Sequence, residues 1–268
     1  MNIGLIGCGR MGGALIEGAV SADIVSAENV WVHSRSKESA QALSQKVGVN
    51  VANDNSHVVS ECDLVILGCK PYQIVDILNE VSSVLPGNTV MLSVAAGITL
   101  EKMEAACPTG TRIIRAMPNT PSLIGLGAAG ISAGAHASAD DISTARKMLE
   151  SVGIVSETTE AQLDAVTGLS GSGPAYVYTF IESLAAQAEK EGLPADEALR
   201  LATQTVIGAA RMIEQQTEMT PRDLINQVTS PGGTTLAGLA ALTESGFENS
   251  IAAGVHAAAE RSREIARE

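Results

Sequence analysis

The sequence has 268 residues, which is enough for one large or two modest domains, each with its own hydrophobic core. Its formal net charge is −13 at pH 7, which argues against a general nucleic-acid or anionic-membrane partner because phosphates need a basic face. No basic segment leads into an apolar run at the start, so we expect no signal peptide, no membrane span and a cytoplasmic protein.

The residue types that bind metals are scattered through the sequence. The four histidines show no HxxxH or His/Cys spacing, which gives no basis for a metal site. The cysteines show no CxxC spacing either, and we expect reduced thiols at Cys8, Cys62, Cys69 and Cys107.

Residues 1–160 alternate short β-branched runs with helical patterns. The strand-like runs are 2–7 (NIGLIG), 29–34 (NVWVHS), 63–69 (DLVILGC), 88–94 (NTVMLSV) and 111–118 (TRIIRAMP). Continuous apolar runs separated by amphipathic stretches such as 71–84 are typical of a parallel sheet with helices on both faces. We therefore predict a Rossmann-like, doubly wound α/β domain over residues 1–160.

A glycine-rich loop, GCGRMG, follows the first strand and precedes the helical segment ALIEGAV. In such a loop Gly7 permits the tight turn, Gly9 lets the backbone approach a pyrophosphate, and Gly12 allows close packing of helix on strand. The N-terminus of the helix then faces the phosphates. We predict dinucleotide binding, and the alternative is a glycine cluster that serves helix packing alone.

The end of the second strand decides which dinucleotide is bound. NAD enzymes usually place an Asp or Glu there for the ribose 2′-hydroxyl, whereas this sequence has Ser34, Arg35, Ser36 and Lys37. Hydroxyls and positive charge suit a 2′-phosphate. We predict that NADP(H) is preferred and that NAD(H) can be used, against the alternative that Arg35 and Lys37 only solvate a loop.

From about residue 161 the strand signal stops and helical patterns take over. The predicted helices cover 173–191, 195–216, a stretch from Pro221, 235–244 and 248–267. Gly192 is predicted as the C′ residue of the first helix, and Thr220 as the N-cap before Pro221. An Ala-rich helical domain buries little of its own surface, so we predict that residues 161–268 form an all-α domain that dimerises.

A turn, Ser-Pro-Gly-Gly-Thr-Thr, interrupts these helices at 230–235. Two adjacent glycines lose much backbone entropy on folding, and Pro231 cannot continue a helix. The turn is either a simple connection between helices or a ligand site. As a ligand site it offers consecutive N–H groups at the positive end of a helix dipole, which suit a carboxylate.

Five motifs resemble those of the Δ1-pyrroline-5-carboxylate reductase family. They are IGLIGCGRMGGAL at 3–15, GCKP at 68–71, RAMPNTP at 115–121, GLSGSGPAY at 168–176 and VTSPGGTT at 228–235, of which the last is the most specific. The match runs nearly end to end, and it implies hydride transfer from NAD(P)H to a cyclic imine, giving L-proline in the last step of proline synthesis. It further implies two chains with interlocked C-terminal helices, and dimers that assemble into a decamer.

The resemblance also implies roles for single residues. The cofactor is expected at Gly7, Gly9, Met11, Gly12, Ser34, Arg35, Asn55, Gly68, Cys69 and Lys70, although Gly68 and Cys69 replace an Ala-Val pair of the relatives and Lys70 could equally be an exposed strand-end charge. The substrate carboxylate is expected at Ser230, Gly232, Gly233 and Thr234. The Thr235 hydroxyl is the expected catalytic group, near the ring nitrogen. Because the imine can arrive already protonated from water, no strong general acid is expected.

Three rival interpretations stand beside this one, and the first is another NADP-dependent imine oxidoreductase. The second is a β-hydroxyacid dehydrogenase. Those enzymes share the glycine loop and a helical second domain, but they carry a catalytic lysine where this sequence has Val177. The third is a non-catalytic NADP-binding sensor, since dinucleotide folds also host regulators. A sensor has no need of the 230–235 turn and would bind NADPH without consuming it.

Overall fold

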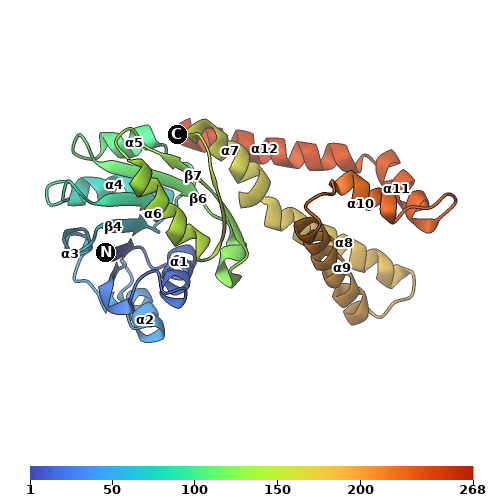
Figure 1. The fold of residues 1–268 in the computed structure, drawn as a ribbon, viewed down its shortest axis with the longest axis horizontal. Helices are drawn as coiled ribbons and strands as arrows, with labels where there is room; N and C mark the ends of the chain where they lie inside the picture. Colours follow the sequence, from blue (N-terminus) through green and yellow to red (C-terminus); the bar gives the residue numbers. More distant parts are fainter. Residues whose placement is uncertain (268) are drawn as a thin grey trace. The chain divides into compact units, whose positions relative to one another are not determined.

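The computed structural model describes residues 1–267, and the chain divides into two compact units (Figure 1). The first comprises Met1–Ser172 together with the segment from Val255 onward, and the second comprises Gly173–Gly254. The division that we placed between residues 160 and 161 falls inside the first unit, because the 3₁₀ turn Glu160–Gln162, α7 (Leu163–Val166) and the π-helical turn Thr167–Gly171 follow there. Leu163 of α7 is fully buried against the sheet.

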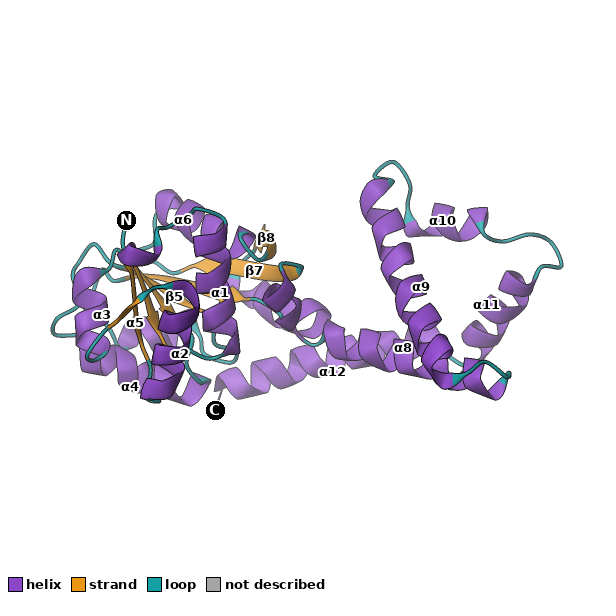
Figure 2. Cartoon of the chain, turned by 90° about the horizontal axis from the view of Figure 1, so that it is seen from below, coloured by secondary structure: helices purple, strands orange, loops and turns teal. Residues whose placement is uncertain are grey.

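An eight-stranded sheet forms the centre of the first unit (Figure 2). Its strands are β1 (Ile3–Ile6), β2 (Val30–His33), β3 (Asn50–Val51), β4 (Leu64–Leu67), β5 (Val90–Ser93), β6 (Arg112–Met117), β7 (Gly127–Ala133) and β8 (Gly153–Glu157). Their order in space is β3-β2-β1-β4-β5-β6-β7-β8, and all neighbours are parallel except β6 and β7. The chain reverses its direction of winding between β1 and β4, which is where open α/β sheets bind ligands.

Helices cover both faces of this sheet, and each face has its own hydrophobic core. One core unites α1 (Arg10–Ser21), α2 (Lys37–Val47) and α6 (Ala139–Glu150) with strand residues such as Leu5 and Ile66. The other unites α3 (Asn55–Glu61), α4 (Pro71–Val81) and α5 (Leu100–Ala105) with alternate strand residues such as Val65 and Leu67. Strands buried on both faces give the continuous apolar runs of the sequence.

The prediction of a doubly wound α/β fold is confirmed, and the five predicted strands correspond to β1, β2, β4, β5 and β6. The sequence prediction missed the other three strands. β3 has only two residues, β8 has no fully buried residue, and β7 reads GAAGISA, whose glycines and alanines produce no β-branched run. The antiparallel pairing of β7 with β6 was therefore missed as well.

The second unit is helical, as predicted. It contains α8 (Gly173–Lys190), α9 (Ala195–Gln215), α10 (Pro221–Gln227), α11 (Thr234–Glu244) and the first turns of α12 (Phe247–Arg267). Gly192 has a φ of 101°, and its N–H and that of Leu193 donate to carbonyls of the last turn of α8, so it acts as the predicted C′ residue. Thr220 caps α10, since its hydroxyl oxygen accepts from the N–H of Asp223.

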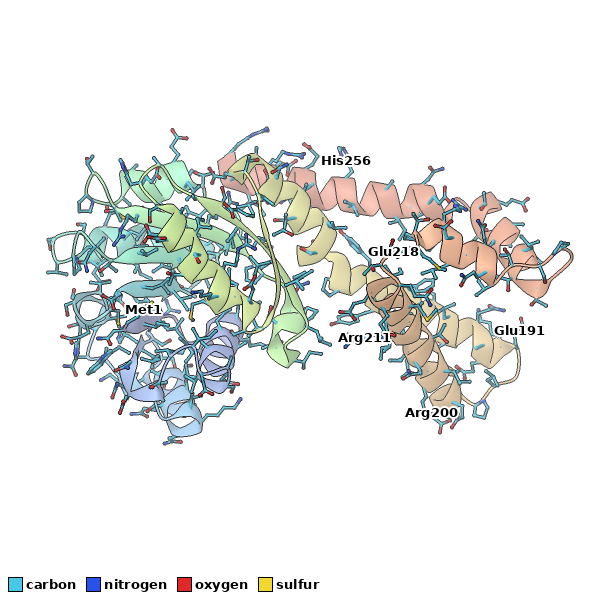
Figure 3. The ribbon with its side chains drawn as sticks, viewed as in Figure 1. Met1, Glu191, Arg200, Arg211, Glu218 and His256 are labelled. Carbon is cyan, nitrogen blue, oxygen red and sulfur yellow. The ribbon has the colours of Figure 1, made fainter. Side chains whose placement is uncertain are left out.

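Charged and apolar side chains are both exposed on this unit. Arg200 and Arg211, labelled in Figure 3, lie on α9, and each pairs with a glutamate three residues away along the helix. Helices α8 and α11 bury no residue at all within the chain. Within residues 1–267, no helix combines the length and the hydropathy that crossing a bilayer requires.

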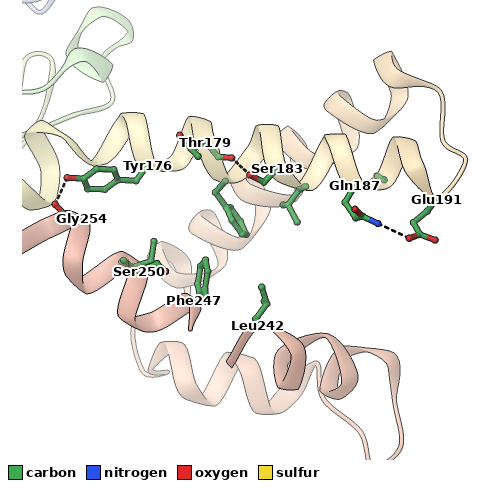
Figure 4. A pocket seen from close by; sticks show the side chains of 13 residues that line it. Tyr176, Thr179, Ser183, Gln187, Glu191, Leu242, Phe247, Ser250 and Gly254 are labelled. Atoms are coloured by element: carbon green, nitrogen blue, oxygen red, sulfur yellow. Dashed lines mark hydrogen bonds between the residues drawn. The ribbon is translucent and has the colours of Figure 1, made fainter. Parts of the chain in front are cut away.

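An apolar groove of about 690 Å³ runs between α8, α11 and the start of α12 (Figure 4). Phe180 and Phe247 face each other across it, with ring centroids 6.0 Å apart. At one end of the groove the Tyr176 hydroxyl donates to the carbonyl of Gly254 (3.1 Å), which ties α8 to α12. We call this feature the α8–α12 groove.

Candidate functional site

A cavity of about 870 Å³ lies at the carboxyl ends of β1, β2, β4 and β5. All predicted cofactor residues except Gly12 line it: Gly7, Gly9, Met11, Ser34, Arg35, Asn55, Gly68, Cys69 and Lys70. The topology explains this arrangement, because parallel strands deliver their following loops to one edge of the sheet. The fold therefore brings these residues together around one cavity, which we call the nucleotide cavity.

The glycine loop packs as its sequence predicts. Gly7 has a φ of 96°, and a Cβ atom there would lie 2.7 Å from the backbone nitrogen of Cys69. Gly12 lies beneath the cavity, where a Cβ atom would lie 2.7 Å from Leu5 and 2.8 Å from the Gly7 carbonyl oxygen. Its role is thus to let α1 approach β1, which is the third glycine's role in this loop.

The loop also presents donors for an anion. Helix α1 begins at Arg10 with Gly9 as N-cap, and no side chain caps it. Its first-turn N–H groups have no partner within the helix and carry the positive end of the helix dipole. A Cβ atom on Gly9 would meet only the Gly68 carbonyl oxygen, at 3.7 Å, so the backbone is open to the cavity. These features fit the pyrophosphate of a dinucleotide.

The segment after β2 supplies one charge to the nucleotide cavity rather than two. Arg35 is exposed, lines the cavity, and makes no ion pair with any of residues 1–267. Lys37 lies outside the cavity lining. Ser36 lines the cavity but is occupied: its hydroxyl caps α2 and donates to Glu38 (2.8 Å), which lowers the pKa of that carboxyl group. Ser34 and Arg35 are the other two residues of this segment that line the cavity.

Residues that sequence reasoning missed complete the cavity wall. They are chiefly Arg10, His33, Gln73, Ile77 and Glu80. Gln73, Ile77 and Glu80 lie on α4, where an amphipathic pattern shows which face packs on the sheet but not which side chains border a cavity. His33 directly precedes Ser34 at the end of β2, so its position at a strand end was the one available signal.

The two thiols of the cavity, Cys8 and Cys69, are half-buried. Burial raises the pKa of each to about 11, so both are neutral thiols at physiological pH. The Cys8 thiol donates to the His33 carbonyl at 3.7 Å. Both cysteines therefore act as small packing residues of the cavity wall.

The predicted substrate turn belongs to the second unit. Gly232 has a φ of 73°, and the Gly233 N–H donates to the Ser230 carbonyl (2.9 Å), which closes a β-turn before α11. The Gly233 amide, which we counted among the carboxylate donors, is thus already engaged. Thr234 and Thr235 open α11, and their exposed N–H groups have no partner within the helix.

Comparisons with known proteins identify the family. Residues 160–265 match the family model described as pyrroline-5-carboxylate reductase dimerisation, and residues 2–97 match one described as NADP oxidoreductase, coenzyme F420-dependent. The chain is 39% identical to the pyrroline-5-carboxylate reductase of Methanosarcina acetivorans (98% of this chain, 97% of the relative), and 38% identical to that of Glycine max (98% and 96%).

Solved structures agree with this similarity. The pyrroline-5-carboxylate reductase of Coxiella burnetii has 34% sequence identity and a TM-score of 0.93 over 98% of both chains. The NADP-bound enzyme of Plasmodium falciparum has 30% identity and a TM-score of 0.88 over 99% of this chain and 98% of its own. With nearly full-length similarity in sequence and in fold, the chain belongs to the pyrroline-5-carboxylate reductase family.

Proposed function

We propose that this protein reduces Δ1-pyrroline-5-carboxylate to L-proline and prefers NADPH to NADH as the hydride donor. The observation that carries the proposal is 38–39% sequence identity, over 98% of this chain, to pyrroline-5-carboxylate reductases from different organisms. The residues of the nucleotide cavity support it independently, since they combine a glycine loop, a helix N-terminus without a side-chain cap, and an arginine that forms no ion pair within residues 1–267. When bound, the reduced nicotinamide supplies the hydride.

The cofactor preference rests on the segment after β2. Arg35 offers a guanidinium group that no carboxylate neutralises among residues 1–267, and Ser34 offers a hydroxyl beside it. No Asp or Glu follows β2 directly to accept from a ribose 2′-hydroxyl. Together these groups favour a 2′-phosphate over a hydroxyl. Asn55 and Lys70 border the same cavity and are proposed to contact the nucleotide as well.

The 230–235 turn is proposed to bind and orient the imine. The Ser230 hydroxyl and the free amides of Gly232 and Thr234 hold the substrate carboxylate, while Gly233 shapes the turn through its bond to Ser230. The Thr235 hydroxyl oxygen accepts from the N–H of the protonated ring nitrogen, which favours the protonated imine and so keeps its carbon electrophilic. The chain contributes orientation and electrostatics rather than a strong acid.

Substitution of Thr235 tests this role directly. Thr235→Ala is expected to lower kcat about 10- to 100-fold without abolishing activity, because the imine can still be protonated by water. Thr235→Ser keeps the hydroxyl and is expected to stay within about threefold of the unmodified protein. Steady-state rates at saturating NADPH measure both. Full activity in Thr235→Ala would show that the hydroxyl plays no part.

The α8–α12 groove is proposed to bind the helices of a second copy, with dimers assembling further into a decamer. Because α8 and α11 bury no residue, packing within one chain leaves many of their apolar side chains exposed, and a partner would cover them. Tyr178 of α8 and Leu242 of α11, both exposed, are examples. Light scattering at micromolar concentration is expected to give at least twice the chain mass; a monomer would contradict the proposal.

The location of the protein is proposed to be the cytoplasm. All four cysteines are free thiols, as is usual in a reducing compartment.

A further inference from the structure

Three polar side chains form a hydrogen-bonded chain along one wall of the nucleotide cavity. The Nδ1 atom of His33 lies 2.7 Å from Oδ1 of Asn55, and the Nδ2 atom of Asn55 donates to Oε2 of Glu80 at 2.9 Å. His33 is the last residue of β2, Asn55 is the first residue of α3, and Glu80 lies in the last turn of α4. Asn55 is 8% exposed, His33 is half-buried, and Glu80 is exposed at the rim. All three line the cavity.

Only one assignment of donors and acceptors satisfies both hydrogen bonds among His33, Asn55 and Glu80. An ionised carboxylate can only accept, so the amide nitrogen of Asn55 must face Glu80. The amide oxygen then faces His33 and needs a donor, which must be an N–H on the Nδ1 atom of the imidazole. Glu80 thus fixes the orientation of the Asn55 amide, and Asn55 fixes the tautomer of His33.

His33 is held at its backbone as well as at its side chain. Its carbonyl oxygen accepts from the Gly7 N–H at 2.8 Å, at the start of the glycine loop. With the side chain bound to Asn55 and the backbone bound to Gly7, the residue has little freedom to move. Ser34 and Arg35 follow it directly, so the segment proposed to meet the 2′-phosphate departs from a fixed point.

We propose that His33 is a positioning residue for NADPH, and that Glu80 acts on the same function through Asn55. The inference rests on the proposed function only in taking NADPH as the ligand. The charge of a carboxylate at the rim of an anion site repels phosphates and by itself weakens NADPH binding. Any favourable effect of Glu80 on NADPH binding must therefore come from the hydrogen bond that it accepts from Asn55. Because His33 is held in place, Ser34 and Arg35, which follow it directly, are held near the 2′-phosphate. The three hydrogen-bonded residues thereby contribute to the preference for NADPH over NADH.

The first test determines the tautomer of His33 without any assay of activity. Ring nitrogen shifts of ¹⁵N-histidine-labelled protein at pH 8 report which nitrogen carries the proton. His33 is expected to be protonated on Nδ1. His57 is the internal control and is expected to be protonated on Nε2, because its Nδ1 accepts from the Asn53 N–H at 3.3 Å. Protonation of His33 on Nε2 alone would overturn the inference.

Two substitutions of Glu80 separate its hydrogen bond from its charge. Glu80→Gln keeps an acceptor for the Asn55 amide and is expected to keep the His33 tautomer. Glu80→Ala removes the acceptor, and we expect His33 to lose its Nδ1–H preference while His57 stays unchanged. Dissociation constants for NADPH are expected to remain within about twofold in Glu80→Gln and to rise about five- to tenfold in Glu80→Ala. Equal weakening in both variants would contradict the positioning role.

Two substitutions of His33 then test which ring nitrogen matters. Asparagine places an N–H near the position of Nδ1, and glutamine places its amide near Nε2, so His33→Asn is the rescue variant and His33→Gln its control. The ratio of NADH to NADPH dissociation constants is expected to be kept in His33→Asn and to fall about five- to tenfold in His33→Gln. The reverse result would show direct contact through Nε2 and overturn the inference. Binding of NADPH without turnover of the imine would refute the proposed function while leaving these binding results interpretable.

Discussion

Replacing Arg35 by alanine is expected to change cofactor selectivity more than any other single substitution in the nucleotide cavity. The side chain is exposed and has no ion-pair partner among residues 1–267, so its removal leaves no buried charge behind and spares the fold. Charge-assisted hydrogen bonds contribute roughly 1.5–3 kcal/mol, and solvent exposure reduces this to about 1–2 kcal/mol. Such a loss lowers kcat/KM for NADPH about 5- to 30-fold.

NADH lacks the 2′-phosphate, so its kcat/KM is expected to stay within about twofold in Arg35→Ala. Lys37→Ala is the matched control, because it removes the same charge two residues away and outside the cavity lining. The assay compares kcat/KM for both cofactors in all three proteins at about 0.05 M and 0.3 M salt, since screening weakens the Arg35 contribution at the higher concentration. An equal fall in kcat/KM for NADPH and NADH, or an equal effect of Lys37→Ala, would show that Arg35 does not select the 2′-phosphate.

Two further predictions concern the glycines around the loop and the two thiols of the nucleotide cavity. Gly7→Ala is expected to destabilise the fold by several kcal/mol and to abolish NADPH binding, because its φ is 96° and the new Cβ would lie 2.7 Å from backbone. Gly13→Ala on α1 is the control: its new Cβ atom would lie 3.9 Å from a Leu43 methyl carbon, so this substitution is expected to raise the melting temperature instead. Because burial raises the pKa of Cys8 and Cys69 from 9.0 to about 11, alkylation by iodoacetamide at pH 8 is expected to be about 100-fold slower than for a free thiol and to accelerate up to pH 11. Rapid labelling at pH 8, read by peptide mass, would contradict that shift.

Patterns that depend on neighbouring residues along the chain were sufficient for much of this structure. The glycine loop, the cap at Thr220 and the C′ residue Gly192 each rest on local backbone geometry, and each is present. Five strands could be predicted because burial on both faces leaves continuous apolar runs. Strand β7 could not, because glycine and alanine pack there against α7 without a β-branched signal.

Features that depend on distant residues were beyond sequence reasoning. The amphipathic pattern of α12 predicts a helix but not its neighbours, and its C-terminal part joins the first unit, where the Ser262 hydroxyl donates to Asp164 (2.7 Å). The bond from Asn55 to Glu80 joins α3 to α4, and neither spacing nor residue type reveals it. Likewise, the pairing of the Gly233 amide with Ser230 follows from the conformation of the turn, which its composition left open.

Loss of NADPH absorbance at 340 nm, when racemic pyrroline-5-carboxylate is added to purified protein, is the most direct test of the proposed reaction. Rapid, imine-dependent oxidation of NADPH is expected, with slower oxidation of NADH and with formation of proline. A 3-hydroxy acid with NADP is the control, and no reduction of NADP is expected because Val177 stands where the dehydrogenases carry a catalytic lysine. Tight NADPH binding to folded protein without turnover of the imine would contradict the account.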